Sequence, residues 1–369
     1  MAYGVSVSVP HGIVCIGGTP DGKRSSASAY LLHTDRHHKL LVDTLPPLPL
    51  PLDNMAGAYG GGYIYVAGGQ SNGHAVNAAF RLRYPRGTAW ERLPDFPGSA
   101  RVQPAAAVQH NATTSCFYLF GGFSPIENTR PAVAHTDGWC YNPVVHQWVK
   151  MANIVPHGRT QAITLSGSFG IASGCAHIVF VGGVNKERFE RAVNMPLLIA
   201  QAERACKQQG THAAQATLAQ LQAEQVAYMR HPAPWYEFND ELVIYHTITD
   251  TWVTESQSPL LARAGAAVVE CGHEWIVVNG EVKPGVRSTD VTACPSLPMR
   301  NVQNTFVSVC PISSASTSIP ACPASAWKSC NPACLLWWRT FGKSCPSPSC
   351  TANSPFSATV SVTSPTSPT

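Results

Sequence analysis

The stretch YIYVAGG at residues 63–69 decides the fold, because an apolar strand that ends in two glycines recurs along the chain. It returns as IVCIGG at 13–18, FYLFGG at 117–122 and IVFVGG at 178–183, and in weaker form as WIVVNG at 275–280. The first four copies follow at intervals of 51, 53 and 61 residues, whereas the fifth comes 97 residues later. Self-similarity at a near-constant period is the signature of a repeat architecture, and the longer last interval indicates an insertion.

Each copy is accompanied by further strand signals at similar offsets. A second apolar strand precedes the glycines, and a strand that contains Trp90, Trp148 or Trp252 follows in three copies. Four strands rich in β-branched and aromatic residues per period of about 50 residues are typical of a kelch-type propeller blade. We therefore predict an all-β, kelch-type β-propeller over residues 1–291, with four blades and the start of a fifth. A sandwich or barrel with chance glycine pairs is the alternative.

The insertion lies at about residues 185–239 and has the composition of helices. We expect one helix to begin near Pro196 and to end before Gly210, the positions that these residue types favour. An Ala- and Gln-rich segment with helical spacing follows at 211–229. The pattern predicts a helical hairpin, which could serve as a lid over the propeller mouth, as an oligomer contact or merely as a decorated loop.

Charge and cysteine are distributed unevenly along the 369 residues. All 21 Asp and Glu lie at or before Asp290, so the formal charge of +4 comes from the four basic residues of the last 78 positions. Seven of the 13 cysteines also lie there, among Ser-Pro runs that cannot bury enough apolar surface for a core. We interpret residues 292–369 as a Ser/Pro/Cys-rich tail that is disordered and forms no folded domain.

Composition also excludes several classes of protein. Neither half of the chain has the clustered basic face that nucleic-acid binding requires. No run approaches the roughly 18 apolar residues of a membrane helix, and the first residues lack the basic start of a signal peptide. We therefore expect a cytoplasmic protein with reduced thiols, without nucleic-acid or membrane partners. The histidines lack metal-ligand spacing, so no metal site is expected.

The string NGEVKPGVR at residues 279–287 stands where the other copies have the paired glycines and the turn that follows them. It brings Glu281, Lys283 and Arg287 into one loop that Pro284 stiffens. A carboxylate beside cationic groups can act as a general acid and base, and an arginine can grip a substrate carboxylate with two hydrogen bonds. A surface turn whose charges are simply solvated is the alternative.

A second group of candidates precedes the inner strands of the predicted blades. Arg101, Arg159 and Arg263 each stand just before such a strand, and Asn54 takes the corresponding place one blade earlier. Because inner strands converge on the central channel, these residues could surround its mouth and bind a small, anionic, polyhydroxylated ligand. Alternatively, the arginines tie neighbouring blades together through backbone carbonyls.

Four segments together resemble a known family. They are NGEVKPGVR, GGVNKERFE at 182–190, WYEFNDELVIYHTITDTW at 235–252 and the opening AYGVSVSVPHGIVCIGG at 2–18. Over about residues 2–291 the chain resembles the N-acetylneuraminate epimerases (sialic acid mutarotases), and more narrowly the cyclically permuted mutarotases of that kelch family.

The resemblance implies a six-bladed propeller that interconverts sialic acid anomers in a central pocket without a cofactor. By position, it makes Glu281 the proton acceptor and Arg287 its charged partner. We also expect Asn279 and Lys283 of the same motif to bind the substrate. The expected partner is a small anionic sugar, and the oligomeric state stays open. A non-catalytic kelch scaffold for protein interaction is the alternative function.

The chain departs from the family after this motif. The family continues with the rest of the fifth blade and a complete sixth, whereas glycine pairs and acidic residues here stop together. We therefore expect an incomplete propeller and interpret the residues from about Thr292 as translated out of frame.

Overall fold

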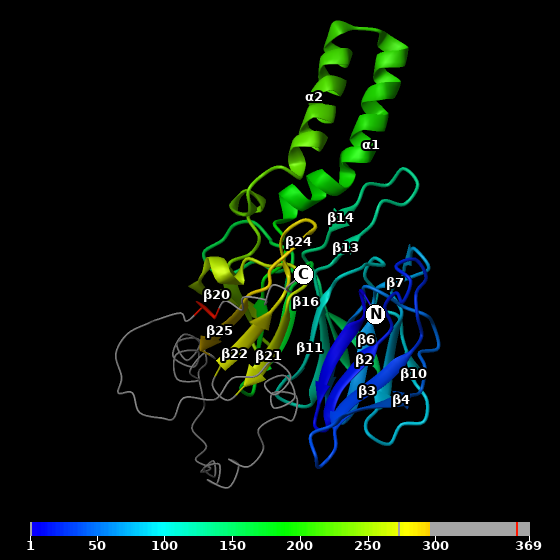
Figure 1. The fold of residues 1–369 in the computed structure, drawn as a ribbon, viewed down its shortest axis with the longest axis vertical. Helices are drawn as coiled ribbons and strands as arrows, with labels where there is room; N and C mark the ends of the chain where they lie inside the picture. Colours follow the sequence, from blue (N-terminus) through cyan, green and yellow to red (C-terminus); the bar gives the residue numbers. More distant parts are fainter. Residues whose placement is uncertain (1, 272–273, 296–358, 361–369) are drawn as a thin grey trace, which may run out of the picture.

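The structure is a computed structural model that describes residues 2–271, 274–295 and 359–360 of the 369. Over these residues the chain is mostly β, as the sequence predicts, and forms five four-stranded antiparallel sheets in chain order (Figure 1). We number them sheets 1 to 5. Each is the four-stranded unit expected of a propeller blade.

The strands of the five sheets have the following bounds. Sheet 1 contains β1 (Val5–Val9), β2 (Gly12–Ile16), β3 (Ala29–Thr34) and β4 (Leu40–Leu45). Sheet 2 contains β5 (Ala56–Gly60), β6 (Tyr63–Ala67), β9 (Ala79–Arg83) and β10 (Glu91–Leu93). Sheet 3 contains β11 (Ala105–His110), β12 (Ser115–Phe120), β15 (Gly138–Asn142) and β16 (Gln147–Met151). Sheet 4 contains β17 (Phe169–Ser173), β18 (His177–Val181), β19 (Glu241–His246) and β20 (Thr251–Gln257). Sheet 5 contains β21 (Ala267–Cys271), β22 (Glu274–Val278), β25 (Val291–Pro295) and β26 (Thr359–Val360).

Short two-stranded hairpins leave three of the sheets directly after the glycine-ended strand. They are β7 (Gln70–Ser71) with β8 (His74–Ala75), β13 (Phe123–Ser124) with β14 (Val133–Ala134), and β23 (Glu281–Lys283) with β24 (Val286–Arg287). The string NGEVKPGVR is therefore one member of a repeated set of loops at the same end of the sheets.

Sheet 5 extends past the boundary expected at residue 291. Its third strand, β25, pairs with β22 from Val291 to Pro295, so regular structure continues four residues into the segment interpreted as a tail. Residues 296–358 and 361–369, on which the rest of that interpretation depends, lie outside the described residues.

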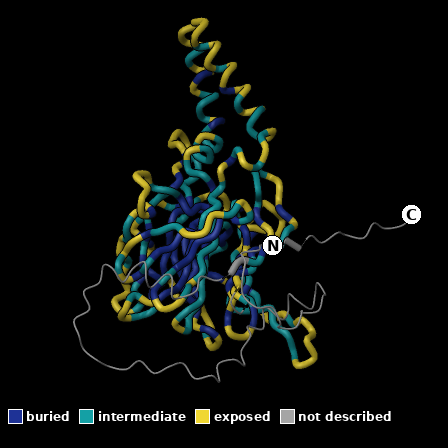
Figure 2. The backbone as a smooth tube through the Cα atoms, turned by 90° about the vertical axis from the view of Figure 1, so that its left-hand side faces the viewer, coloured by how far each residue is buried: buried dark blue, intermediate teal, exposed yellow. Residues whose placement is uncertain are grey.

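Neighbouring sheets pack through aromatic and aliphatic side chains. Tyr65 of sheet 2 stacks on Phe117 of sheet 3 with ring centroids 5.1 Å apart. Phe120 of sheet 3 meets Phe180 of sheet 4 edge-on at 5.5 Å. Buried residues are concentrated in these strands, whereas most residues of the helices are intermediate or exposed (Figure 2). Burial of large rings between sheets supplies the main stabilising contribution, because each removes 150–250 Å² from water.

The paired glycines are where the connection between sheets passes close to a strand end. Gly182 has φ +70°, and a Cβ at this position would lie 2.0 Å from the carbonyl oxygen of Arg263. Only glycine combines the left-handed conformation with such close approach of another backbone. The repeated dipeptide is thus a packing requirement between successive sheets.

The insertion contains α1 (Lys186–Gln209), α2 (His212–Tyr228) and the 3-10 turn η1 (Ala233–Tyr236), and a second turn, η2 (Pro259–Leu261), precedes sheet 5. The two helices form a hairpin that projects away from the sheets (Figure 1). None of the helices in the described residues is both long and apolar enough to cross a membrane.

The helix start expected at Pro196 is wrong, because α1 begins ten residues earlier. Asn185 is its N-cap, and its side-chain oxygen accepts a hydrogen bond from the Arg188 backbone N at 3.1 Å. Asparagine satisfies the orphan donors of the first turn, so this cap outweighs the preference of proline for a helix start. Pro196 lies inside α1, whereas the expected end at Gly210 is where the structure places it, in the left-handed conformation.

Candidate functional site

A cavity of about 850 Å³ lies where the first strands of the five sheets meet. β1, β5, β11, β17 and β21 all contribute wall residues, many of them small or apolar, such as Gly57, Ala106 and Gly170. The volume falls in the range of small-molecule sites. Side chains from α1, η1 and the β23–β24 hairpin line the cavity as well, so one of its ends is decorated with polar and aromatic groups.

A chain of backbone hydrogen bonds runs around this decorated end. Tyr3, Asn54, Gln103, Gly167 and Gly265 each lie just before the first strand of one sheet and all have positive φ. Each backbone N donates to the carbonyl of the preceding member, at 2.7, 2.7, 3.2 and 2.7 Å along the series. We call these five residues the rim. The rim links the five sheets in order and places the predicted residue Asn54 at the cavity.

The amide side chains of the rim are oriented by a buried carboxylate. Asp53 is 1% exposed and accepts from the Asn54 Nδ2 and the Ser25 Oγ, both at 2.6 Å. Since this carboxylate only accepts hydrogen bonds, the Asn54 amide points its nitrogen at Asp53 and its oxygen away from it. The Asn54 Oδ1 then accepts a hydrogen bond from the Gln103 Nε2 at 3.4 Å. Gln103 is thereby left with its Oε1 as an acceptor at the cavity.

The motif hairpin brings together the predicted acid–base pair. Glu281 and Arg287 are opposite each other in the β23–β24 pairing, and the Glu281 Oε1 lies 3.7 Å from the Arg287 Nη2. The side chains are 34% and 60% exposed and both line the cavity. The backbone of Glu281 exchanges two hydrogen bonds with Ala264, at 2.7 and 2.9 Å, which fixes the hairpin to the connection next to the rim.

The other two candidates of the motif have different surroundings. Asn279 adopts φ +58°, and its carbonyl accepts a hydrogen bond from Arg263 at 3.2 Å. The Lys283 Nζ donates to the carbonyls of Met229 and His231, at 3.3 and 3.1 Å. Neither residue is among those that line the cavity, so the expectation that they contact a ligand there is not met.

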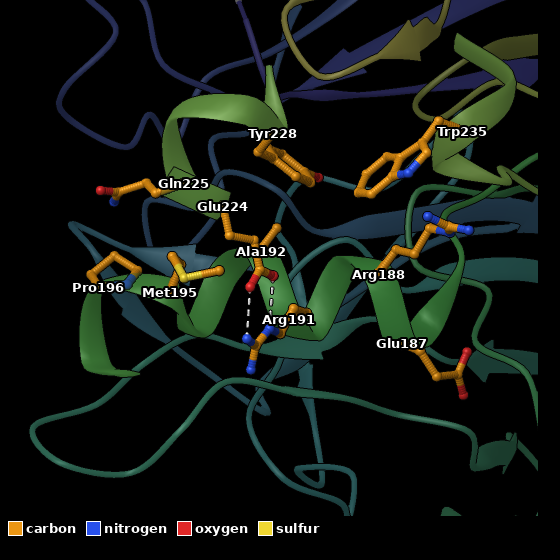
Figure 3. A pocket seen from close by; sticks show the side chains of 10 residues that line it. All are labelled: Glu187, Arg188, Arg191, Ala192, Met195, Pro196, Glu224, Gln225, Tyr228 and Trp235. Atoms are coloured by element: carbon orange, nitrogen blue, oxygen red, sulfur yellow. Dashed lines mark hydrogen bonds and ion pairs between the residues drawn. The ribbon is translucent and has the colours of Figure 1, made fainter. Parts of the chain in front are cut away.

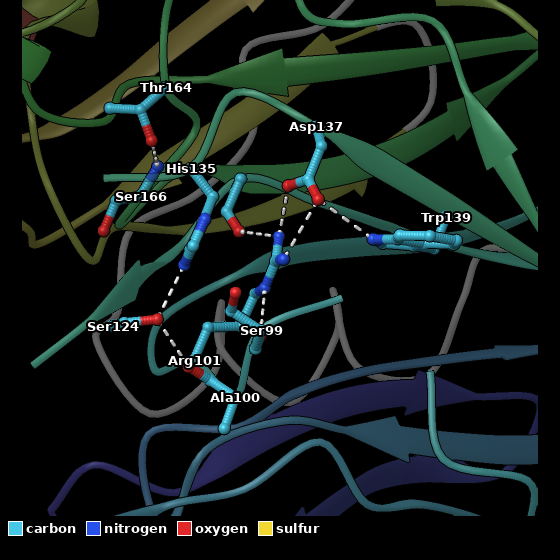
Figure 4. Close-up of polar contacts among 10 residues, drawn as sticks. Ser99, Ala100, Arg101, Ser124, His135, Asp137, Trp139, Thr164 and Ser166 are labelled. Atoms are coloured by element: carbon cyan, nitrogen blue, oxygen red, sulfur yellow. Dashed lines mark hydrogen bonds and ion pairs between the residues drawn. The ribbon is translucent and has the colours of Figure 1, made fainter. Parts of the chain in front are cut away.

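Arg101 does not face the cavity, contrary to the expectation for the channel mouth. It is fully buried, and its guanidinium donates to both carboxylate oxygens of Asp137, at 2.5 and 3.1 Å, and to the Gly121 carbonyl at 3.0 Å (Figure 4). Its own carbonyl accepts from the Gly69 backbone N at 2.8 Å. Arg101 therefore ties sheet 2 to sheet 3, which is the alternative role considered from the sequence.

Burial around Arg101 also affects its titratable neighbours. Burial would raise the pKa of Asp137, but the hydrogen bonds and charge of Arg101 outweigh it and hold that pKa below its usual value. Burial, followed by the charge of Arg101, lowers the pKa of His135 to about 4. The His135 Nε2 lies 2.7 Å from the Ser124 Oγ. This polar cluster supports the sheet contact and lies outside the cavity lining.

Arg263 repeats the arrangement between sheets 4 and 5. Its carbonyl accepts from the Gly183 backbone N at 2.8 Å, and its side chain donates to the carbonyls of Asn279 and Asp290 and to the Thr292 Oγ1. It is 2% exposed, and burial lowers its pKa. Arg263 is therefore a tie between sheets, and the expectation that it lines the channel is wrong.

Arg159 neither ties two sheets together nor lines the cavity. It is paired with Glu241 of β19, and its side chain is 42% exposed. The place that Arg101 and Arg263 take beside a paired glycine belongs in this sheet to Leu165, whose backbone N would lie 2.7 Å from a Cβ at Gly121. Arg159 lies ten residues before β17, whereas Arg101 and Arg263 each lie four residues before β11 and β21, so the expectation that Arg159 directly precedes its strand is wrong.

The helical insertion supplies cavity residues to which sequence reasoning assigned no role. Arg188 and Phe189 of α1, Tyr228 at the end of α2, Tyr236 of η1 and Phe238 line the cavity. The segments GGVNKERFE and WYEF that contain four of them were noted only as family resemblance. An arginine and three aromatic residues that flank a predicted insertion next to a glycine pair are the signal that could have found them.

Arg188 stands between the cavity and a second, smaller pocket. Its guanidinium lies over the Trp235 ring at 4.4 Å and donates to the Glu237 Oε1 at 2.6 Å. The second pocket, of about 360 Å³, lies between α1, α2 and η1 and shares Arg188, Ala192 and Tyr228 with the main cavity (Figure 3).

Taken together, the repeated antiparallel sheets and the charged pair at the cavity define a propeller-like protein with a candidate small-molecule site. A family model described as N-acetylneuraminate epimerase matches residues 45–309. The chain therefore belongs to the N-acetylneuraminate epimerase family.

Individual relatives agree with this assignment. The N-acetylneuraminate epimerase of Salmonella typhimurium is 29% identical over 249 residues, which is 67% of this chain and 57% of the relative. That of Haemophilus influenzae is 30% identical over 249 residues, 68% of this chain and 58% of the relative. The chain thus spans a little over half the length of the curated relatives it matches. The solved "Structure of YjhT" aligns with a TM-score of 0.52 and 24% identity over 68% of this chain and 65% of that one, which indicates a shared fold.

Proposed function

We propose that this protein is an isomerase that accelerates the interconversion of the anomers of N-acetylneuraminate or a related sialic acid. The observation that carries the proposal is the Glu281–Arg287 pair on the wall of the 850 Å³ cavity. Membership of the N-acetylneuraminate epimerase family supports the choice of sugar.

Mutarotation requires two proton transfers, and it breaks and re-forms the bond between the anomeric carbon and the ring oxygen. The Glu281 carboxylate takes the proton of the anomeric hydroxyl, the bond between the anomeric carbon and the ring oxygen breaks, and the ring oxygen receives that proton from the Glu281 carboxyl. The open-chain ketone rotates, and the same steps in reverse close the ring on its other face. Only protons move between the sugar and the carboxylate, and nothing is oxidised or released, so the reaction needs general acid–base groups alone.

The cavity offers groups that suit the rest of the substrate. Among the described residues that line it, Arg188 and Arg287 carry the guanidinium groups, and either can hold the sugar carboxylate with two hydrogen bonds. The amides of Asn54 and Gln103 can meet hydroxyl or N-acetyl groups at the rim. Because Arg101 and Arg263 are occupied between sheets, we assign them no part in binding.

We further propose the blade number, the reading frame of the last residues and the compartment of the protein. We interpret the five sheets as blades of a six-bladed type of β-propeller that is incomplete over the described residues. In our interpretation the residues from about Thr292 onward are translated out of frame, although the family match extends to residue 309. We place the protein in the cytoplasm, which the six free cysteines of the described residues suit.

The rival function is a kelch-repeat scaffold that binds a protein partner without catalysis. A charged pair at the wall of a cavity gives no advantage to such a scaffold, and the relatives carry the name of an enzyme. Exchange spectroscopy by NMR separates the two functions. The protein should accelerate anomer exchange of N-acetylneuraminate, and should leave that of the uncharged N-acetylmannosamine near its spontaneous rate. A protein that accelerates neither supports the scaffold.

A further inference from the structure

We infer that Lys283 is a positioning residue that fixes the catalytic hairpin to the end of α2, so that the helical insertion sets the position of Glu281. The inference rests on the proposed function. It gives the insertion a specific task that differs from the lid, oligomer contact and decorated loop considered from the sequence, and it replaces the expectation that Lys283 binds the sugar directly.

One of the two carbonyls that Lys283 meets belongs to the C-cap of α2, Met229, and the other to His231, two residues further on. The last four carbonyls of a helix have no partner within the helix, and a cation near them is favourable. α2 has no basic residue in its own last turn. The Lys283 ammonium donates to the carbonyls of Met229 and His231, and so places a positive charge at this end of α2 from another part of the chain.

The segment after α2 is a firm support for this contact. His231 stacks on Trp235 with ring centroids 3.8 Å apart, and the Tyr236 hydroxyl donates to the Tyr228 carbonyl. The Trp235 ring carries Arg188 of α1 on its face at 4.4 Å. The segment is therefore held to both helices and does not depend on Lys283 alone for its shape.

The hairpin, in contrast, needs an external support. β23 and β24 are short, and an isolated two-stranded hairpin is marginally stable in water. At one end the backbone of Glu281 is paired with Ala264. Lys283 stands at the other end of β23, so its contact with α2 completes a fixation on both sides of the turn that contains Pro284.

The test compares Lys283→Met and Lys283→Arg with Lys207→Met, a matched control that removes an exposed lysine from the last turn of α1. A displacement of about 1 Å at a catalytic group can reduce a rate by up to about 100-fold. We expect Lys283→Met to lower kcat for anomer exchange about tenfold with KM nearly unchanged. Lys283→Arg should restore much of it, and Lys207→Met should match the parent.

Hydrogen exchange measures the same contact without any sugar. Amides at the end of α2 should exchange faster in Lys283→Met than in Lys207→Met. Adding Val226→Lys places a basic residue in the last turn of α2 itself, at an exposed position. This double variant should recover the amide protection of α2 but not kcat, because the helix end is stabilised while the hairpin stays untethered.

Three results would overturn the inference. They are unchanged hydrogen exchange in Lys283→Met, full recovery of kcat by Val226→Lys, and a large rise in KM at constant kcat, which would make Lys283 a binding residue. If the parent protein itself fails to exchange anomers, the proposed function fails, while hydrogen exchange still decides whether Lys283 anchors α2.

Discussion

At the scale of single residues, burial separates the charged groups that hold the fold from those that face the cavity. Arg101 is fully buried against Asp137, whereas Glu281 and Arg287 are partly exposed at the cavity wall. The sequence predicted that Glu281 and Arg287 share one loop because both lie in one short string, and the structure has them 3.7 Å apart at the cavity. The sequence could not separate Arg101 from a ligand-binding arginine, because the partner Asp137 lies 36 residues away and only the folded sheets bring the two together.

Replacement of Arg101 by Met should therefore act on stability. It leaves the largely buried Asp137 without its cation, and breaking a buried pair typically costs about 3–5 kcal/mol. Asp137 retains some solvent contact, so we expect a loss of about 2–4 kcal/mol in the free energy of unfolding, measured by urea denaturation. Arg159→Met, at an exposed pair, should lose less than about 1 kcal/mol. Equal losses in the two variants would contradict the assignment.

Partly buried His135 should make stability depend on pH. Its pKa is lowered to about 4 in the folded protein, so the unfolded chain, with a pKa of about 6.5, binds the proton first as the pH falls. Stability should consequently decrease between pH 6.5 and 4. We expect His135→Gln to remove about 1–2 kcal/mol of the loss between pH 7 and pH 4.5. His177, whose pKa is also lowered to about 4, contributes in the same direction and should keep part of the pH dependence in the variant.

At the scale of elements, a strand or helix could be predicted where the residues that determine it are neighbours in the sequence. Strands that end in glycine pairs were predictable, because period and residue type both belong to one short segment. The start of α1 was missed, since an Asn185 cap competes with the Pro196 signal and only the cap geometry decides between them. The rim was not predictable, because its members, such as Asn54 and Gln103, share only a backbone conformation and a hydrogen bond across sheets.

The paired glycines can be tested against a glycine of equal backbone conformation. Gly182 and Gly210 have φ of +70° and +60°, but a Cβ would clash at Gly182 and would meet open space at Gly210. Gly210→Ala should lose only about 1–2 kcal/mol of unfolding free energy, the penalty of a left-handed alanine. Gly182→Ala should lose at least about 2 kcal/mol more, because the Arg263 carbonyl must move. Thermal or urea unfolding measures both, and equal losses would refute the packing role.

At the scale of the whole molecule, five successive sheets surround one cavity, and the rim runs from Tyr3 in sheet 1 to Gly265 in sheet 5. The composition break after sheet 5 leads to a genetic prediction. If the residues from about Thr292 onward are read out of frame, a neighbouring frame of the coding DNA should encode glycine pairs and Trp-bearing strands at the blade period. Sequencing this region decides the matter, and the absence of such a pattern from both other frames would contradict the interpretation.

The central claim is that Glu281 transfers the protons of sialic acid mutarotation, and anomer exchange of N-acetylneuraminate in Glu281→Gln tests it most directly. Glu224→Gln is the matched control, because Glu224 is paired with Arg191 on the helical hairpin and does not line the main cavity. The amide keeps the shape of the side chain and removes its basicity. We predict that the parent and Glu224→Gln accelerate exchange equally, while Glu281→Gln falls at least about 100-fold, toward the spontaneous rate. Exchange by Glu281→Gln as fast as by the parent would contradict the account.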